Sequence, residues 1–347
     1  MILAGDIGGT HARFAFFEPV AGRLRLLSEF VFASREHSGL DQILASLLAS
    51  TPTRPDLACF GIAGPVRNGR VETSNLPWIV EARQVASDLH IDRALLINDL
   101  EANAWGVGIL DPSDLVSLSH VHGAVASGNQ AVIAAGTGLG EAGLYWDGSA
   151  HHVFASEGGH TDFAPRNDKE ISLLKYLRVR FGHVSYERIV SGPGLVNVFH
   201  FLRDTGHGRE PAWLLEEMKH SDPAAAISRA ALDGKCPLSE QALDLFISIY
   251  GSEAGNLALK VMATGGLYLG GGIAPKLLPK LSGPLFMQSF LEKGRMQSLL
   301  ETIPVNVVMN EKTALLGAAR FAAAQPLTVS GSPAPDPGLI PTSRNFG

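Results

Sequence analysis

Cysteine is almost absent from this sequence, which holds only Cys59 and Cys236. The two lie far apart, and neither has Cys or His neighbours at metal-ligand spacing, so neither a disulfide framework nor a cysteine-based zinc site is predicted. No apolar run approaches the roughly 20 residues that span a bilayer. The first residues also lack the basic and apolar regions of a signal peptide. We therefore expect a soluble cytoplasmic protein.

Long basic runs are missing too. The formal net charge is -6 over 347 residues, which argues against nucleic acid or an anionic membrane as the main partner. A small ligand fits better, and a nucleotide stays possible because N–H groups at glycine turns can hold phosphate without a basic patch. The composition, with 46% hydrophobic residues and 38 glycines, is that of a globular protein, and the length favours two domains with a cleft between them.

Two segments, residues 2–17 and 131–146, share one pattern: an apolar stretch, a Gly/Thr turn and a second apolar stretch. Each predicts a β-hairpin. A dinucleotide-binding fingerprint would instead require a helix after the glycines. The repeated pattern predicts two related domains.

Further strands are predicted at residues 57–62, 94–97, 267–269 and 305–308, and helices at 39–49, 238–262 and 311–324. Mixed strand and helix order predicts an α/β fold. We expect a small domain of residues 1–109 plus 303–325, and a large domain of residues 110–302. The five prolines of residues 326–347 predict a flexible tail.

The first hairpin turn combines a carboxylate with two glycines. Asp6 ends the predicted strand, Gly8 and Gly9 let backbone N–H groups approach phosphate oxygens, and Thr10 adds a hydroxyl donor. Asp6 can also hold Mg²⁺ through water, because Mg²⁺ favours a carboxylate together with substrate phosphates. The alternative is an ordinary glycine hairpin in which Asp6 forms the turn.

Glycine turns recur at two later positions. Gly136, Thr137 and Gly138 occupy the matching place in the second hairpin, so two phosphate-binding turns can clamp a nucleotide from both domains, although a tight hairpin needs the same residues. Gly271 and Gly272 follow a predicted strand and would let an adenosine lie against backbone. A bare strand-to-helix turn is the alternative there.

Polar side chains at two further places suit a polyol. Asn98 and Asp99 follow a strand end, where Asp99 can accept a proton from a substrate hydroxyl and Asn98 offers a donor and an acceptor. The same pair can simply cap the following helix. Glu157, His160 and Glu187 would add two carboxylates and an imidazole, and a structural role for His160 remains open.

Taken together, these segments resemble bacterial glucokinase of the type without a cysteine zinc motif, within the hexokinase, actin and Hsp70 superfamily. The resemblance runs from about Leu3 to Ala319 and rests on blocks in the family's order. They are LAGDIGGTHARF, GIAGPVRNGRVETSNLPW, LLINDLEANAWG, AAGTGLGEAGLYW, EGGHTDFAP, GHVSYERIVSGPGLVNVF, YLGGGIAPKLL, and KGRM with IPVNVV. It implies a two-domain actin-like, ribonuclease H-like fold that phosphorylates glucose at the 6-hydroxyl with ATP and Mg²⁺, feeding glycolysis, as a homodimer.

The resemblance also implies roles for single residues. Asp99 would be the base, and glucose would contact Asn98, Asp99, Glu157, His160 and Glu187. ATP would lie between a first phosphate loop and a second one, with Gly271 and Gly272 near adenosine. These loops comprise Asp6, Ile7, Gly8, Gly9, Thr10 and His11, and Gly136, Thr137 and Gly138.

Three departures from the family pattern are visible: His11 and Ser74 stand where Asn and Thr are expected, and the proline-rich tail extends beyond the family's usual end. His11 leaves its own contact with phosphate open. Two alternatives also stay open: a kinase for mannose, fructose or glucosamine, and a sugar sensor without catalysis, because a fold does not guarantee its activity. Asp99 and the two glycine turns favour the enzyme.

Overall fold

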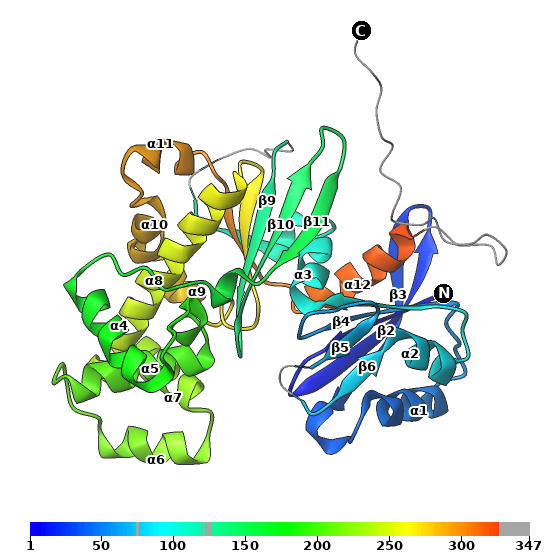
Figure 1. Cartoon of the computed structure of the whole chain (residues 1–347), viewed down its shortest axis with the longest axis horizontal. Helices are drawn as coiled ribbons and strands as arrows, with labels where there is room; N and C mark the ends of the chain where they lie inside the picture. Colours follow the sequence, from blue (N-terminus) through cyan, green and yellow to red (C-terminus); the bar gives the residue numbers. More distant parts are fainter. Residues whose placement is uncertain (74–75, 120, 122–126, 326–347) are drawn as a thin grey trace, which may run out of the picture.

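The structure is a computed structural model that describes residues 1–73, 76–119, 121 and 127–325. Ser74 and the predicted tail at 326–347 lie outside these residues. The described chain forms two mixed sheets, one of five strands and one of six, and a small two-stranded sheet. Figure 1 shows the five-stranded sheet beside the N-terminus and the six-stranded sheet between it and a layer of helices.

The five-stranded sheet has the order β3-β2-β1-β4-β7. β1 pairs antiparallel with β2 and parallel with β4, which in turn pairs parallel with β7. Its strands are β1 (Ile2–Ile7), β2 (His11–Val20), β3 (Arg23–Ala33), β4 (Leu57–Ile62) and β7 (Ala94–Asn98). The separate two-stranded sheet consists of β5 (Arg70–Glu72) and β6 (Ile79–Glu81).

Both faces of this sheet are covered, because alternate side chains of β1 point in opposite directions. Leu3 and Ile7 join a buried cluster with α1 (Leu40–Ser50) and α2 (Ala82–Leu89). Ile2 and Ala4 instead pack with α3 (Asp99–Val107) and α12 (Thr313–Ala324). Residues from the far end of the chain therefore complete this half of the molecule.

The six-stranded sheet has the order β11-β10-β9-β12-β13-β8. β9, β10 and β11 form an antiparallel meander, whereas β12 pairs parallel with β9 and with β13. The strands are β8 (Leu115–Ser117), β9 (Gln130–Ala135), β10 (Leu139–Trp146), β11 (His151–Ser156), β12 (Gly266–Gly270) and β13 (Val305–Val308).

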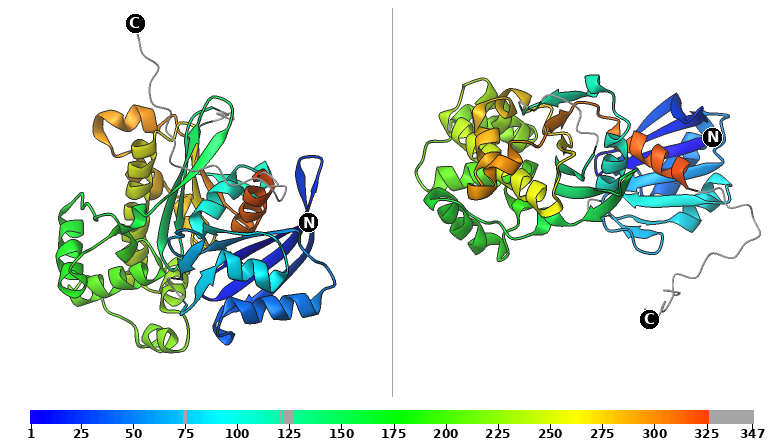
Figure 2. Two further views of the ribbon diagram at one scale, coloured as in Figure 1. Left: turned by 45° about the vertical axis from the view of Figure 1, so that its right-hand side comes forward. Right: turned by 90° about the horizontal axis from the view of Figure 1, so that it is seen from above.

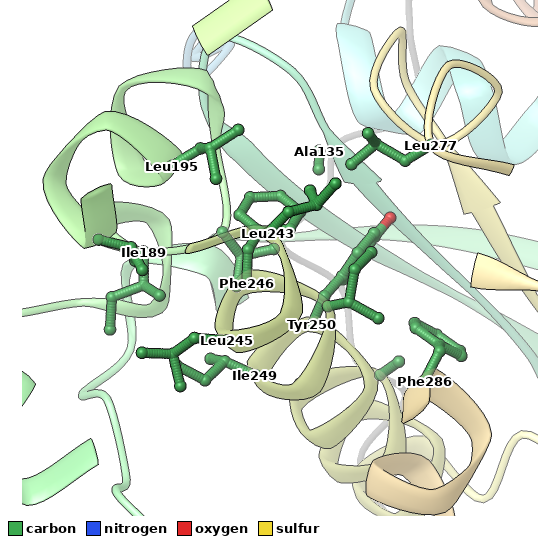
Figure 3. Packing of buried hydrophobic residues seen from close by; sticks show 14 of the residues in the cluster. Ala135, Ile189, Leu195, Leu243, Leu245, Phe246, Ile249, Tyr250, Leu277 and Phe286 are labelled. Carbon is green, nitrogen blue, oxygen red and sulfur yellow. The ribbon is translucent and has the colours of Figure 1, made fainter. Parts of the chain in front are cut away.

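The helical layer packs around α8, which is buried along most of its length. Figure 3 shows Phe246 and Tyr250 of α8 among apolar side chains that include Ala135 of β9. The Tyr250 ring meets the rings of Phe246 and Phe286 edge-on, at 6.0 and 5.6 Å between centroids. The helices are α4 (Asp168–Phe181), α5 (Gly192–Asp204), α6 (Ala212–His220), α7 (Pro223–Leu232), α8 (Pro237–Val261), α9 (Leu278–Leu281), α10 (Pro284–Leu291) and α11 (Gln297–Leu300).

The predicted hairpins are confirmed as β1–β2 and β9–β10, and the other predicted strands and helices lie where the patterns placed them, within a few residues at their ends. β13 pairs with β12 in the six-stranded sheet. The predicted small domain begins again at residue 303, so its boundary separates these two paired strands. The domain boundaries stay a proposal, and we propose that the chain returns to the first sheet after Val308. Within the described residues, no helix is long and apolar enough to cross a membrane.

Helix α3 lies between the two sheets (Figures 1 and 2). On one side it crosses α12 so closely that a β-carbon at Gly317 would lie 1.7 Å from the carbonyl oxygen of Ala102. On the other side Ala104 and Val107 pack against Val132 of β9 and apolar residues of β10. The position of α3 is therefore fixed by both halves of the chain.

Gly317→Ala is expected to lower the free energy of unfolding by about 1–3 kcal/mol, because the added methyl group must push two packed backbones apart. This loss acts against the gain in helix propensity that alanine normally brings. Chemical denaturation measures it. Ala323→Val, on the exposed side of the same helix, is the control, and equal stabilities of the two variants would contradict the close crossing.

Candidate active site

A cleft of about 690 Å³ opens between the two sheets. This volume is in the range of small-molecule sites. It brings together predicted residues from six separate parts of the chain. Those that line it are Gly8, Gly9, Asn98, Asp99, Gly136, Thr137, Gly138, Glu157, His160, Glu187 and Gly271.

The remaining predicted residues adjoin the cleft without being among the described residues that line it. Ile7 is 2% exposed and belongs to the core beneath the sheet, so only its backbone is available to a ligand. Thr10 and His11 are exposed beside the first turn. Gly272 follows Gly271, and a β-carbon there would meet no atom within 4 Å, so nothing in its packing requires glycine.

The first glycine turn is held in shape by Ser34. The hydroxyl of Ser34 donates to the carbonyl of Gly8 at 2.8 Å, and its N–H donates to the carbonyl of Thr10 at 2.9 Å. Within the turn, the N–H of Gly8 donates to the carbonyl of His11 at 3.0 Å. Ser34 is fully buried. Sequence reasoning missed it, because nothing at position 34 marks a contact with residues 8–10.

Asp6 is not among the described residues that line the cleft, but its carboxyl lies close enough to that of Asp99, which does line it, for the two charges to interact. Burial and the nearby Asp99 carboxylate raise the pKa of Asp6 to about 6, although Arg13 lowers it. Such mutual repulsion is relieved by a cation. Oxygen ligands of this kind suit Mg²⁺ with water and phosphate completing its coordination, and the described residues hold no group of three or more His, Cys, Asp or Glu that could form an all-protein metal site.

Asn98 and Asp99 differ in what their side chains do. Asn98 caps α3, since its Oδ1 accepts the N–H of Leu100 at 2.8 Å and that of Glu101 at 3.4 Å, while its Nδ2 donates to the carbonyl of Gly64 at 3.1 Å. The helix-capping interpretation is therefore confirmed for Asn98. Asp99 is the first residue of α3 and lines the cleft.

The electrostatic surroundings of Asp99 suit a base. Burial raises the pKa of its carboxyl, and the charge of Glu157 adds to this, whereas the N–H of Leu100, at 2.9 Å from Oδ1, lowers it. A carboxylate with a raised pKa holds a proton more readily than a free one. Asn103, missed from the sequence, also lines the cleft and fixes the backbone here, with its Nδ2 donating to the carbonyl of Asp99 at 3.0 Å.

On the opposite wall, two short turns hold the remaining polar side chains. The turns are η3 (Gly158–His160) and η4 (Tyr186–Arg188). His160 Nε2 lies 3.9 Å from Glu157 Oε2 and 4.0 Å from Glu187 Oε2. Glu187 Oε2 also accepts the N–H of Leu139 at 3.0 Å. An imidazole between two carboxylates presents both donors and acceptors to a polyol.

The second glycine turn touches this polar group. A β-carbon at Gly138 would lie 2.5 Å from Glu187 Oε2, so glycine keeps that carboxylate in place. The carbonyl of Gly136 accepts the N–H of Gly192 at the start of α5, at 2.8 Å. At Gly271 the φ angle is +79° and a β-carbon would lie 2.4 Å from the carbonyl of Ala135, so only glycine fits.

Arg67 also lines the cleft, together with Gly64 and Pro65. It is exposed and brings a positive charge to a wall that is otherwise acidic or neutral. The segment GPVRNG supplies a signal for a turn, but the turn alone does not say that it faces the same opening as Asp99.

Known proteins resemble this chain over nearly its whole length. The family description "Glucokinase" matches residues 3–325. A glucokinase of Nostoc sp. is 42% identical over 344 residues, which cover 93% of this chain and 99% of that relative. The crystal structure of a glucokinase from an Antarctic psychrotroph is 32% identical, with a TM-score of 0.79 over 93% of this chain and 99% of that one.

A third match shows the fold alone: the Balamuthia mandrillaris glucokinase, solved in complex with glucose, is 22% identical with a TM-score of 0.76 over 93% of each chain. The two mixed sheets and the cleft between them define a sugar kinase of the actin-like fold. The chain belongs to the glucokinase family. Its activity is the ATP-dependent phosphorylation of glucose.

Proposed function

We propose that glucose binds in the cleft with its 6-hydroxyl beside Asp99, and that Asn98, Glu157, His160 and Glu187 bind its other hydroxyl groups. The observation that supports this is the meeting of Asp99 and two glycine turns in one opening. Asp99 accepts the hydroxyl proton as the oxygen forms its bond to the terminal phosphorus of ATP. The bond between that phosphorus and the bridging oxygen breaks, and ADP leaves.

ATP lies between the two glycine turns in this proposal, with adenosine near Gly271 and Gly272. Backbone N–H groups of residues 6–11 and 136–138 then bind its phosphates. Asp6 would hold Mg²⁺ through water, and the ion would supply positive charge that offsets the charge of the transferring phosphate. Closing of the cleft excludes water, which is itself a phosphoryl acceptor.

The test is an ADP-release assay with a panel of hexoses. Glucose is expected to give the highest kcat/KM, with mannose, fructose and glucosamine lower, because one unpaired polar group in a site built for hydroxyls costs affinity. A higher kcat/KM for another hexose would assign the enzyme to that sugar. Absence of ADP release with every sugar would overturn the proposal.

We also propose a cytoplasmic homodimer. The family resemblance supports it, and light scattering on the eluted protein tests it: a mass of twice 36.8 kDa is expected. A monomeric mass at micromolar concentration would contradict it.

Glu157→Gln is expected to raise the KM for glucose about tenfold, with a smaller change in kcat. The amide keeps the shape of the side chain but exchanges an anionic acceptor for a neutral one, which weakens its hydrogen bonds to hydroxyl groups. Steady-state kinetics at saturating ATP measure the effect. An unchanged KM for glucose would remove Glu157 from the sugar site.

A further inference from the structure

A pair of buried carboxyl groups lies beneath the sugar-side turn. Glu141 of β10 is 1% exposed and Glu253 of α8 is fully buried, and the two carboxyl groups are within hydrogen-bonding range of each other. Neither residue lines the cleft. The chemistry proposed above uses neither of them, although buried carboxyl groups are costly to keep without a role or a partner.

The hydrogen-bond partners of the two carboxyl groups indicate that Glu141 is the one that carries a proton. Glu253 accepts from Lys260 Nζ at 3.1 Å and from Asn256 Nδ2 at 2.7 Å, so its negative charge is compensated. Glu141 Oε1 is buried and has no hydrogen-bond partner among the described residues. A proton on Glu141, donated to Glu253, satisfies both groups. Burial and the neighbouring Glu253 raise the pKa of Glu141 to about 8, although Lys260 lowers it.

The turn that carries Glu157 and His160 rests on Glu141. A β-carbon at Gly158 would lie 1.9 Å from Glu141 Oε2, so the backbone of the turn is in contact with the carboxyl group. Ser156 links the same parts, because its hydroxyl donates to the carbonyl of Glu141 at 3.0 Å and accepts the N–H of Gly158 at 3.2 Å. Movement of the Glu141 side chain would therefore move this turn.

The network also reaches the other turn. Asn256 Nδ2, which donates to Glu253, lies 3.0 Å from the hydroxyl oxygen of Tyr186. Tyr186 immediately precedes Glu187. One network of buried polar groups thus supports both turns from below.

We propose that Glu141 is a positioning residue for the sugar: the proton that it shares with Glu253 holds the two turns in their binding geometry, and loss of that proton weakens glucose binding. This inference rests on the sugar site proposed above. Two neighbouring ionised carboxyl groups repel each other in a buried site, and the positive charge of Lys260 offsets only part of this repulsion. Because Glu141 Oε2 already contacts the backbone of Gly158, a shift of the ionised carboxylate displaces the turn.

Other titratable groups face the pair from each packed element. Tyr186 of η4 and Tyr250 of α8 have pKa values raised, first of all by burial, so they stay neutral through the range considered. Lys260 stands at the end of α8. Lys293, after α10, donates to Ser252 at 3.0 Å, and burial lowers its pKa. Variants of Glu141, Glu253 and Lys260 distinguish the ionisation of the carboxyl pair from that of these other groups.

The experiment measures kcat and the KM values for glucose and ATP between pH 6 and 9.5. In the wild type the KM for glucose is expected to rise about tenfold per pH unit above the ionisation of the pair, as for loss of one essential proton, while the KM for ATP stays level. Glu141→Gln keeps an N–H donor toward Glu253 and has no proton to lose, so its KM for glucose should stay level. Glu253→Gln should do the same.

Lys260→Met should move the alkaline rise in the KM for glucose to higher pH. Without the ammonium group the doubly ionised pair is less stable, so the rise in KM for glucose should begin at higher pH than in the wild type. Glu301→Gln, an exposed carboxyl change after α11, is the control and should follow the wild type. A merely structural role for Glu141 would not produce these opposed changes.

Thermal unfolding over the same pH range provides a second readout. Because the folded-state pKa of Glu141 lies above its unfolded value, its stabilising contribution is fully present below about pH 4.5 and is lost as pH rises toward 8. Glu141→Gln should therefore gain Tm relative to the wild type as pH rises from 5 to 8. A constant Tm difference would contradict the shared proton.

The outcomes separate the two proposals. If the wild type does not phosphorylate glucose at any pH, both the proposed sugar site and this inference are overturned. If glucose is phosphorylated but Glu141→Gln and Glu253→Gln both keep the alkaline rise in KM, only the positioning role of Glu141 is overturned. An equal rise in the KM for ATP would overturn it too.

Discussion

Asp99→Asn is expected to lower kcat by about 10²-fold to 10⁴-fold while glucose still binds. Asparagine has nearly the same shape, and the Leu100 N–H that now donates to Asp99 Oδ1 at 2.9 Å can donate to the amide oxygen instead. The amide cannot accept the hydroxyl proton. The chemical step is therefore lost, while the helix start and the cleft wall remain.

Two measurements check this result. Coupled kinetics give kcat, and titration calorimetry gives the glucose affinity in the absence of ATP. Asp92→Asn, an exposed carboxyl change before β7, serves as the control. A kcat within a few-fold of the wild type would exclude Asp99 as the base, and loss of glucose binding together with kcat would assign it to binding.

The pH dependence of the wild type adds a directional check. Burial raises the pKa of Asp99, and a base must be ionised to act. Activity should therefore fall as pH decreases through that raised pKa, so the acid limb of kcat/KM lies above the usual range of an aspartate. An acid limb at or below that of a free aspartate would contradict this environment.

Asp6→Asn is expected to raise the Mg²⁺ concentration needed for half-maximal activity about 10-fold to 100-fold, because residues that orient a metal's water ligands contribute that much to its affinity. At saturating ATP, kcat should fall by about 10²-fold as the charge at the transferring phosphate is less well stabilised. The Asn side chain also ends the repulsion between Asp6 and Asp99, so the fold should be retained.

A magnesium titration at fixed ATP and saturating glucose measures the effect. Asp99→Asn is the matched comparison, because it removes the other carboxylate of the pair and should leave the magnesium requirement near that of the wild type. If Asp6→Asn shows an unchanged requirement, Asp6 does not hold the ion.

The parts of the fold that the sequence predicts well carry local signals. The hairpins around Gly8 and Gly138 combine apolar alternation with turn glycines, and the strand at 94–97 precedes a recognisable helix start. The strand at 305–308 is also predicted from its local pattern, but the strand with which it pairs is not. No short-range pattern decides that β13 joins β12, which is why a domain boundary placed at 303 separates paired strands.

The residues of the candidate site likewise form two groups: those that a local sequence pattern marks, and those that only tertiary packing brings there. Asp6, Asp99 and the glycines stand beside turns that the sequence marks. Ser34 lies far along the chain from the loop it holds, and the hydroxyl group gives no sign of its acceptor. Glu141 and Glu253 are 112 positions apart and meet only because α8 packs against β9, the strand beside β10, so their proximity depends on tertiary packing that no spacing rule describes.

The crossing of α3 and α12 has a consequence for Asp99, the proposed base. Gly317 meets the backbone at Ala102, less than one helical turn from Asp99. Helix α12, none of whose described residues lines the cleft, thus fixes the position of the segment that carries the proposed proton acceptor. A chain shortened before Thr313 would keep every residue that we propose to contact sugar or nucleotide and yet lose the alignment of the proposed acceptor.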